Sequence, residues 1–125
     1  MQRSPSSSPV RLLSVLAVVV VASALAGPAL AARAHATATI KVKVTAVEFK
    51  FTLSPATVKP GTVTFTVANK GKLSHDFKID GKKTPLIKPG KSASLTVTLK
   101  AGKYPYLCTV PGHAAAGMKG TLVVK

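Results

Sequence analysis

The sequence predicts an all-β protein, a Greek-key β-sandwich of seven or eight short strands. From residue 40 onward, apolar and polar residues alternate with a period of two, and many of the apolar ones are β-branched or aromatic. Turn-forming glycines and prolines recur roughly every 8 to 12 residues, which is typical of sandwiches and barrels. No stretch in this region shows a helical periodicity of useful length, so helical classes are disfavoured.

The first predicted strands lie between residues 40 and 53. Ile40, Val42 and Val44 alternate with lysine and threonine, which predicts one buried and one exposed face. The alternation changes phase at residues 45–47. It then resumes with four apolar positions: Val47, Phe49, Phe51 and Leu53. A phase change of this kind indicates a bulge or a bend between two strand segments.

The next strands flank a turn that is bracketed by Pro55 and by Pro60–Gly61. Residues 62–68 form a strand with three inward apolar side chains: Val63, Phe65 and Val67. A turn at residues 69–72 leads into residues 73–79. In that segment one face is shared by three residues: His75, Phe77 and Ile79.

The C-terminal half completes the predicted sheets. Asp80–Gly81 is a turn signal, and a lysine-rich loop follows over residues 82–91. Three further strands are expected: residues 92–100, 104–108 and 120–125. The first of them directs four apolar side chains inward: Ala93, Leu95, Val97 and Leu99.

The N-terminal third has the features of an export signal. Arg3 and Arg11 precede an apolar run of 15 residues at 12–26, which is short for a membrane span of about 20 residues. Small residues at 29–31 follow a Gly-Pro pair, so we expect a secretory signal peptide over residues 1–31, cleaved after Ala31. An uncleaved segment acting as a membrane anchor is the alternative. Residues 32–39, with His35, are expected to be a flexible leader to a domain at residues 40–125.

The chain is strongly basic, with a formal net charge of +15 at pH 7. From Ala32 onward, 16 lysines and arginines stand against three acids, which gives +13. Nucleic-acid binding is disfavoured because the cations, nearly all lysine, are spread out and lack interleaved aromatic residues. We therefore expect a domain that is steered toward an acidic redox protein partner or an anionic membrane surface. A monomer is the simplest expectation for its oligomeric state.

The single cysteine, Cys108, lies in the stretch YPYLCTVPGHAAAGMKG at residues 104–120. An odd cysteine in an exported chain needs an explanation such as an intermolecular bond, a reactive thiol or a metal. His113 and Met118 follow at intervals of five residues, and His75 is the histidine that falls inside the predicted domain. Thiolate, imidazole and thioether groups suit copper, so His75, Cys108, His113 and Met118 are a candidate set of ligands.

At these residues the sequence resembles the cupredoxins, the small blue copper proteins of the plastocyanin and azurin type. The resemblance covers roughly residues 38–125 and rests on four motifs: Gly102-x-Tyr104-x-Tyr106-x-Cys108, Pro111-Gly112-His113, Gly117-Met118-x-Gly120 and His75-Asp76. The resemblance implies a cupredoxin-like sandwich with one copper ion that alternates between Cu(I) and Cu(II). It also implies that the protein carries single electrons between redox partners and is not an enzyme.

The resemblance also implies roles for residues around the ligands. Asp76, where the family commonly has asparagine, would link the two ligand-bearing segments through a hydrogen bond. The ring edge of His113 would be the exit for the electron, inside a small apolar patch: Pro111, Gly112 and Ala114–Ala116. Lysines of the neighbouring turns would form a positive rim around that patch. Tyr104 and Tyr106 are expected to be structural.

Four alternatives stand beside this interpretation. Taken alone, Cys108 could be an inert buried thiol. A thiol hydrolase would need a positioned base and an oxyanion site, for which the sequence offers no context. A copper enzyme would need a second, catalytic copper ion, and only His35 would remain as a histidine ligand for it. A copper carrier or storage protein could use the same ligands, although carriers more often use clusters of methionine and histidine, and this chain has only Met1 and Met118.

Overall fold

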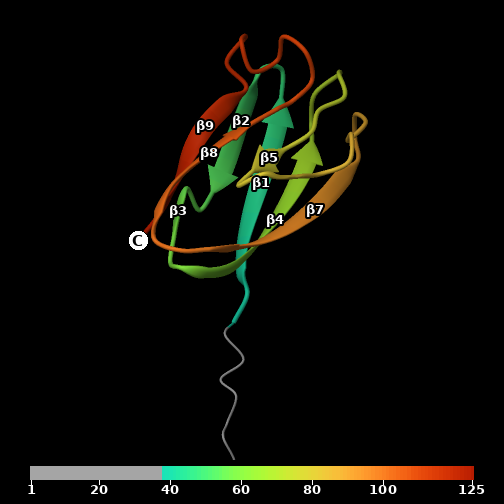
Figure 1. Ribbon diagram of the computed structural model, residues 1–125. Helices are drawn as coiled ribbons and strands as arrows, with labels where there is room; N and C mark the ends of the chain where they lie inside the picture. Colours follow the sequence, from blue (N-terminus) through green and yellow to red (C-terminus); the bar gives the residue numbers. More distant parts are fainter. Residues whose placement is uncertain (1–37) are drawn as a thin grey trace, which may run out of the picture. The chain divides into compact units, whose positions relative to one another are not determined.

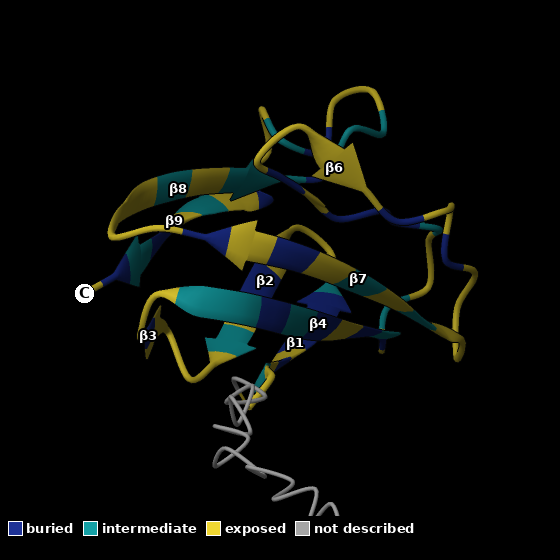
Figure 2. Cartoon of the chain, turned by 60° about the horizontal axis from the view of Figure 1, so that its bottom comes forward, coloured by how far each residue is buried: buried dark blue, intermediate teal, exposed yellow. Residues whose placement is uncertain are grey.

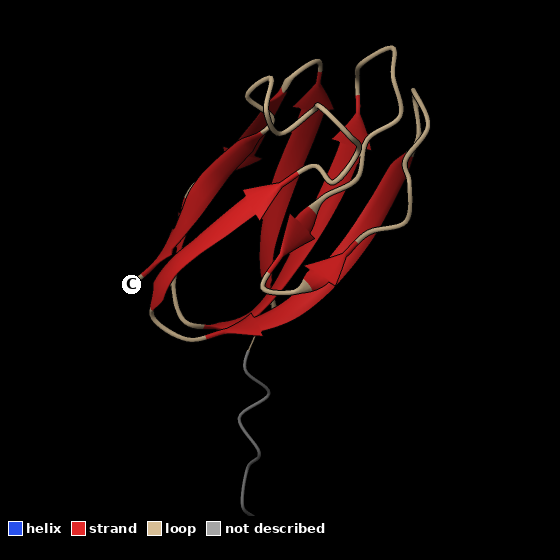
Figure 3. Ribbon diagram, turned by 45° about the horizontal axis from the view of Figure 1, so that its top comes forward, coloured by secondary structure: helices blue, strands red, loops and turns tan. Residues whose placement is uncertain are grey.

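The computed structural model describes residues 38–125, and these form two β-sheets packed face to face (Figures 1 and 3). The strands are β1 (Ile40–Val47), β2 (Lys50–Ser54), β3 (Thr57–Val58), β4 (Gly61–Asn69), β5 (Lys78–Ile79), β6 (Lys82–Lys83), β7 (Ser92–Leu99), β8 (Gly102–Leu107) and β9 (Lys119–Val124). One sheet has the order β2-β1-β4-β7 and the other the order β3-β9-β8-β5-β6. The predicted all-β sandwich is confirmed.

The alternating strands bury one face each because successive side chains of a strand point to opposite sides. In β1, Val42, Val44 and Ala46 are buried while the lysines and threonine between them are exposed. β4 pairs with β1 in parallel and with β7 antiparallel, so its apolar face lies at the centre of the sheet. The buried residues of both sheets belong to one hydrophobic core, and Figure 2 shows them in dark blue along the strands.

The centre of the core is a cluster of aromatic rings around Phe77. The Phe77 ring lies with its centroid 5.3 Å from that of Phe51, 5.3 Å from Phe65 and 5.5 Å from Tyr106. Phe65 and Phe77 are fully buried. Phe77 stands two residues after His75, so this cluster fixes the segment on which the first candidate ligand lies.

Two details differ from the prediction for residues 45–53. β1 continues in phase through Ala46, and no bulge or bend occurs at residues 45–47; instead β1 and β2 form a tight antiparallel hairpin, with Val47 opposite Lys50. Glu48 and Phe49 are the turn. The phase change therefore marks a reversal of the chain, and the Phe49 side chain is 39% exposed instead of lying in strand phase.

The strand count and the setting of His75 also differ from the prediction. Residues 38–125 contain nine strands instead of seven or eight. The count is higher because it includes three strands of only two residues each: β3, β5 and β6. His75, Phe77 and Ile79 are all buried as expected. However, His75 precedes β5 and is held by an isolated bridge to Ile87, with N–H···O distances of 3.1 and 2.7 Å between the two backbones.

The predictions for the N-terminus fall outside the described residues. These are the signal peptide at residues 1–31, most of the leader at residues 32–39, and His35. Within residues 38–125, no helix is long and apolar enough to cross a membrane.

Candidate metal centre

Three candidate ligands lie on one loop between two strands of the same sheet. Cys108 follows β8 directly, Met118 precedes β9 directly, and His113 stands between them. The Cys108 N–H donates to the Met118 carbonyl oxygen at 3.0 Å, and the Met118 N–H donates to the His113 carbonyl oxygen at 3.0 Å. These bonds tie the backbones of all three residues to one another, so the loop is a compact unit at one end of the sandwich (Figure 1).

Two glycines let the loop fold this tightly. Gly112 and Gly117 have φ angles of 82° and 115°, which residues with a Cβ atom rarely adopt. Gly112 directly precedes His113 and Gly117 directly precedes Met118, so these backbone angles help to place both residues.

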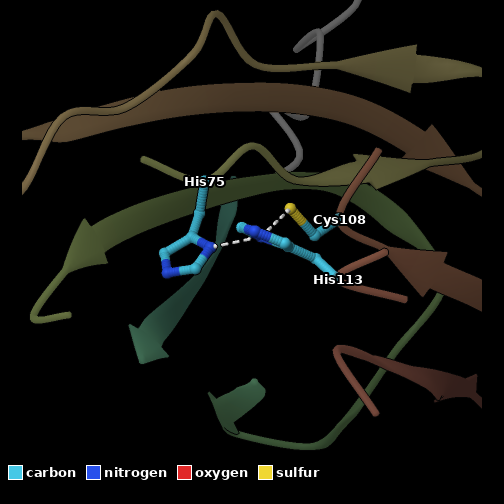
Figure 4. A group of neighbouring side chains, drawn as sticks. All are labelled: His75, Cys108 and His113. Atoms are coloured by element: carbon cyan, nitrogen blue, oxygen red, sulfur yellow. Dashed lines mark hydrogen bonds between the residues drawn. The ribbon is translucent and has the colours of Figure 1, made fainter. Parts of the chain in front are cut away.

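His75, Cys108 and His113 converge on one another (Figure 4). Their ligating atoms all lie within 4.8 Å of one another. The Nδ1 atoms of the two histidines are 3.0 Å apart, and the Cys108 Sγ is 3.6 Å from the His113 Nδ1. His75 and Cys108 are 0% and 1% exposed, and His113 is 8% exposed. The structure thus brings together three of the four predicted site residues through their side chains.

Met118 is fully buried and stands five residues after His113 in the chain. Its backbone bonds to Cys108 and His113 place it at the same end of the sandwich. Its role as a weak axial ligand stays a prediction.

Asp76 links the two ligand-bearing segments, as the resemblance implied. The Thr109 N–H donates to Asp76 Oδ1 at 2.6 Å, and the Thr109 hydroxyl donates to Asp76 Oδ2. Asp76 is adjacent to His75 and Thr109 is adjacent to Cys108, so these two bonds tie together the backbones of the first two candidate ligands. Lys83 Nζ lies 3.7 Å from Asp76 Oδ2 and partly balances its charge.

Two residues of the β1–β2 turn were not among the predicted site residues. Glu48 Oε1 lies 3.1 Å from His75 Nε2, and the Phe49 ring lies edge-on to His113 with centroids 5.1 Å apart. One turn therefore contacts both candidate histidine ligands. The sequence marks Glu48 only as one of three acids from residue 32 onward, directly after the phase change at residues 45–47, and this does not indicate its contact with His75.

The electrostatics of the site follow from burial and hydrogen bonding. Burial raises the pKa of the Cys108 thiol, so the metal-free protein holds it protonated near neutral pH. A hydrogen bond from the Leu73 backbone is the main cause that lowers the pKa of Glu48 from 4.5 to about 2, with further bonds from His75 and Lys72. Glu48 is therefore a carboxylate across the physiological pH range.

The donor set fits a single copper ion. One thiol and two imidazoles, all buried, offer one soft and two borderline donors, and the thioether of Met118 follows His113 by five residues. Such a mixed set serves both Cu(I), which favours sulfur, and Cu(II), which favours imidazole nitrogen.

The class of protein follows from this combination of a β-sandwich and a loop with Cys, His and Met. The model of the cupredoxin-like domain family matches residues 15–124, and the chain belongs to this family. The resemblance stated from the motifs is thereby confirmed.

Particular relatives match smaller parts of the chain. The copper-resistant cuproprotein CopI of Pseudomonas aeruginosa is 46% identical over 50 residues, which are 39% of this chain and 28% of that protein. Rusticyanin of Acidithiobacillus ferrooxidans is 39% identical over 83 residues, covering 50% of this chain and 53% of that protein. The chain spans about half the length, or less, of the curated relatives it matches.

A solved structure agrees with the fold. Auracyanin A, a blue copper protein from Chloroflexus aurantiacus, superposes with a TM-score of 0.59 over 70% of this chain and 100% of its own. The sequence identity is 23%, so this likeness bears on the fold alone.

Proposed function

We propose that this protein is an exported, mononuclear type 1 copper protein that carries one electron at a time between redox partners. The observation that carries the proposal is the convergence of His75 Nδ1, His113 Nδ1 and Cys108 Sγ in a buried position. The same group lies next to Met118, in a member of the cupredoxin-like family. The chain is not proposed to be an enzyme.

In this proposal, His75, Cys108 and His113 hold the metal and Met118 is the weak axial ligand. Copper supplies a one-electron couple between Cu(I) and Cu(II). The protein supplies rigidity, because His75 is fixed by its bridge to Ile87 and the other three ligands by the bonds within their loop. Ligands that barely move between two oxidation states favour fast electron transfer.

The surface around His113 suits brief docking of a partner. His113 is the most exposed of the three converging residues, and exposed small or apolar residues follow or precede it: Pro111, Gly112, Ala115 and Ala116. Six lysines in the segments before and after His75 are exposed: Lys70, Lys72, Lys82, Lys83, Lys88 and Lys91. Two of the three acids of this region, Glu48 and Asp76, are engaged in hydrogen bonds within the protein. This arrangement favours an acidic protein partner, with an anionic membrane surface as the other candidate.

A matched pair of variants tests the docking surface. Ala115→Glu should slow electron transfer to an acidic redox partner, because it places a negative, bulky group beside His113. Ala101→Glu makes the same change in the exposed turn between β7 and β8, at the other end of β8 from Cys108, and should leave the rate unchanged. Equal rates for both variants and the parent protein would count against the docking surface.

A copper carrier or storage role is the second candidate. The match to a copper-resistant cuproprotein favours it. Repeated reduction and reoxidation at an electrode, followed by metal analysis, separates the two functions. An electron carrier should keep one copper ion per chain through many cycles, whereas loss of copper on reduction would favour the carrier for the metal.

A further inference from the structure

The Glu48 carboxylate is bound from three sides by groups of the segment that leads to His75. Its Oε1 accepts hydrogen bonds from the Lys72 N–H at 2.8 Å and the Leu73 N–H at 2.7 Å, and it lies 3.1 Å from His75 Nε2. The carboxylate comes from the β1–β2 turn, which stands 27 residues before His75 in the chain. Its side chain is 26% exposed, whereas that of His75 is 0% exposed.

Gly71 leaves room for this carboxylate because glycine has no side chain. A Cβ atom added to Gly71 would lie 2.3 Å from Glu48 Oε1 and 2.7 Å from its carboxyl carbon. The position of the carboxylate therefore depends on the absence of a side chain at residue 71. Asn69 holds the same turn in place, since its side-chain amide donates to the carbonyl oxygens of Leu73 at 2.7 Å and Ile87 at 2.8 Å.

The contact with Glu48 decides which nitrogen of His75 is free to bind a metal. A carboxylate only accepts hydrogen bonds, so the His75 Nε2 must carry the proton. In the neutral ring the lone pair then belongs to Nδ1, and Nδ1 is the atom that faces His113 Nδ1. The hydrogen bond at one side of the ring thus prepares the other side as a metal ligand.

The contact also adds negative charge to the imidazole. A carboxylate that accepts from the far nitrogen of a ligating histidine raises the basicity of the nitrogen bound to the metal. A more basic imidazole favours the more highly charged ion, which is Cu(II) rather than Cu(I).

We propose that Glu48 is a positioning residue of the copper site: it holds His75 in the Nε2–H tautomer and strengthens the binding of Cu(II) relative to Cu(I). This inference rests on the proposed copper site and adds to it a residue from a third segment of the chain. The β1–β2 turn thereby supplies the residue that positions His75, and Gly71 provides the space for the Glu48 carboxylate.

Four variants test this role. Glu48→Ala removes the acceptor, and Glu48→Gln keeps an acceptor oxygen of similar reach but removes the charge. Gly71→Ala leaves Glu48 in the chain but forces its carboxylate to move. Asp80→Asn removes an equal charge from an exposed turn, where a φ of 50° is readily adopted by asparagine, and serves as the control.

Two measurements are made on each variant. The first is the ¹⁵N NMR signature of the His75 ring in the copper-free protein, which reports the tautomer whether or not copper binds. We expect a single Nε2–H tautomer in the parent, Glu48→Gln and Asp80→Asn proteins, and a mixture of tautomers in Glu48→Ala and Gly71→Ala.

The second measurement is the affinity for Cu(II) and for Cu(I), determined by competition with chelators. Glu48→Ala should weaken Cu(II) binding by about 10- to 100-fold, as for other partners of metal-bound histidines. Cu(I) binding should weaken less. Glu48→Gln should recover part of the loss, and Asp80→Asn should lie within about twofold of the parent protein.

The outcomes separate this inference from the copper site itself. An Nε2–H tautomer that persists in Glu48→Ala, or Cu(II) and Cu(I) affinities that fall equally, would overturn the positioning role. If Glu48→Ala does not fold, Gly71→Ala provides the tautomer comparison and Glu48→Gln provides the comparison of the Cu(II) and Cu(I) affinities. A parent protein with no specific copper affinity would contradict the proposed function, while the tautomer measurement would still decide whether Glu48 controls His75.

Discussion

The link between Asp76 and Thr109 gives the sharpest test of how the two ligand segments are held together. In Asp76→Ala, the Thr109 N–H and hydroxyl both lose their acceptor. A hydrogen bond to a charged group contributes about 1.5–3 kcal/mol, and Thr109 is only half-buried, so water replaces part of what is lost. We therefore expect the free energy of unfolding to fall by about 3 kcal/mol, a large share of the roughly 5–15 kcal/mol of a typical domain.

Asp76→Asn is the matched comparison for this prediction. The asparagine oxygen can accept from the Thr109 N–H, and its amide can donate to the Thr109 hydroxyl oxygen, so both contacts survive. We expect a loss of less than about 1 kcal/mol. Urea unfolding of the copper-free, reduced proteins measures both values without a contribution from bound metal. An Asp76→Ala protein within about 0.5 kcal/mol of the parent, or equal losses in the two variants, would refute the reasoning.

Two further predictions concern the core and the response to acid. Phe65→Ala removes a fully buried ring that lies 5.3 Å from Phe77, and it should lower the free energy of unfolding by about 3–5 kcal/mol in urea; a loss below about 1 kcal/mol would contradict the described core. Because the pKa of Glu48 falls from 4.5 to about 2 on folding, its stabilising contribution is complete above pH 4.5 and is lost as the pH falls toward 2. Urea titrations of the copper-free protein should thus show a stability difference between the parent and Glu48→Gln that shrinks over this range, and a constant difference would be inconsistent with it.

The sequence predicted the strands whose pattern is set by burial on one face. The alternations of β1, β4 and β7 identified the inward residues, because a half-buried strand must alternate. The grouping of His75 with Cys108 and His113 was predictable as well, because few residue types suit copper and the chain contains few of them.

The β1–β2 turn was not predictable in the same way. Neither Glu48 nor Phe49 is of a residue type that is common in turns. Phe49 also continues the apolar alternation, although its ring contacts His113 instead of the core. The contact of Glu48 with His75 depends on how the sandwich brings distant segments together, and no local pattern encodes it. The two-residue strands β3, β5 and β6 are too short to show any periodicity.

The proposed copper site requires that the Cys108 thiolate binds copper together with two histidines. The most direct measurement is the visible absorption spectrum of the domain after Cu(II) addition, recorded in parallel for Cys108→Ser. We expect an intense blue band in the parent protein that is absent from the variant. A colourless parent protein, or one with only weak absorption that the variant retains, would show that the thiolate does not bind Cu(II), and would rule out the proposed site.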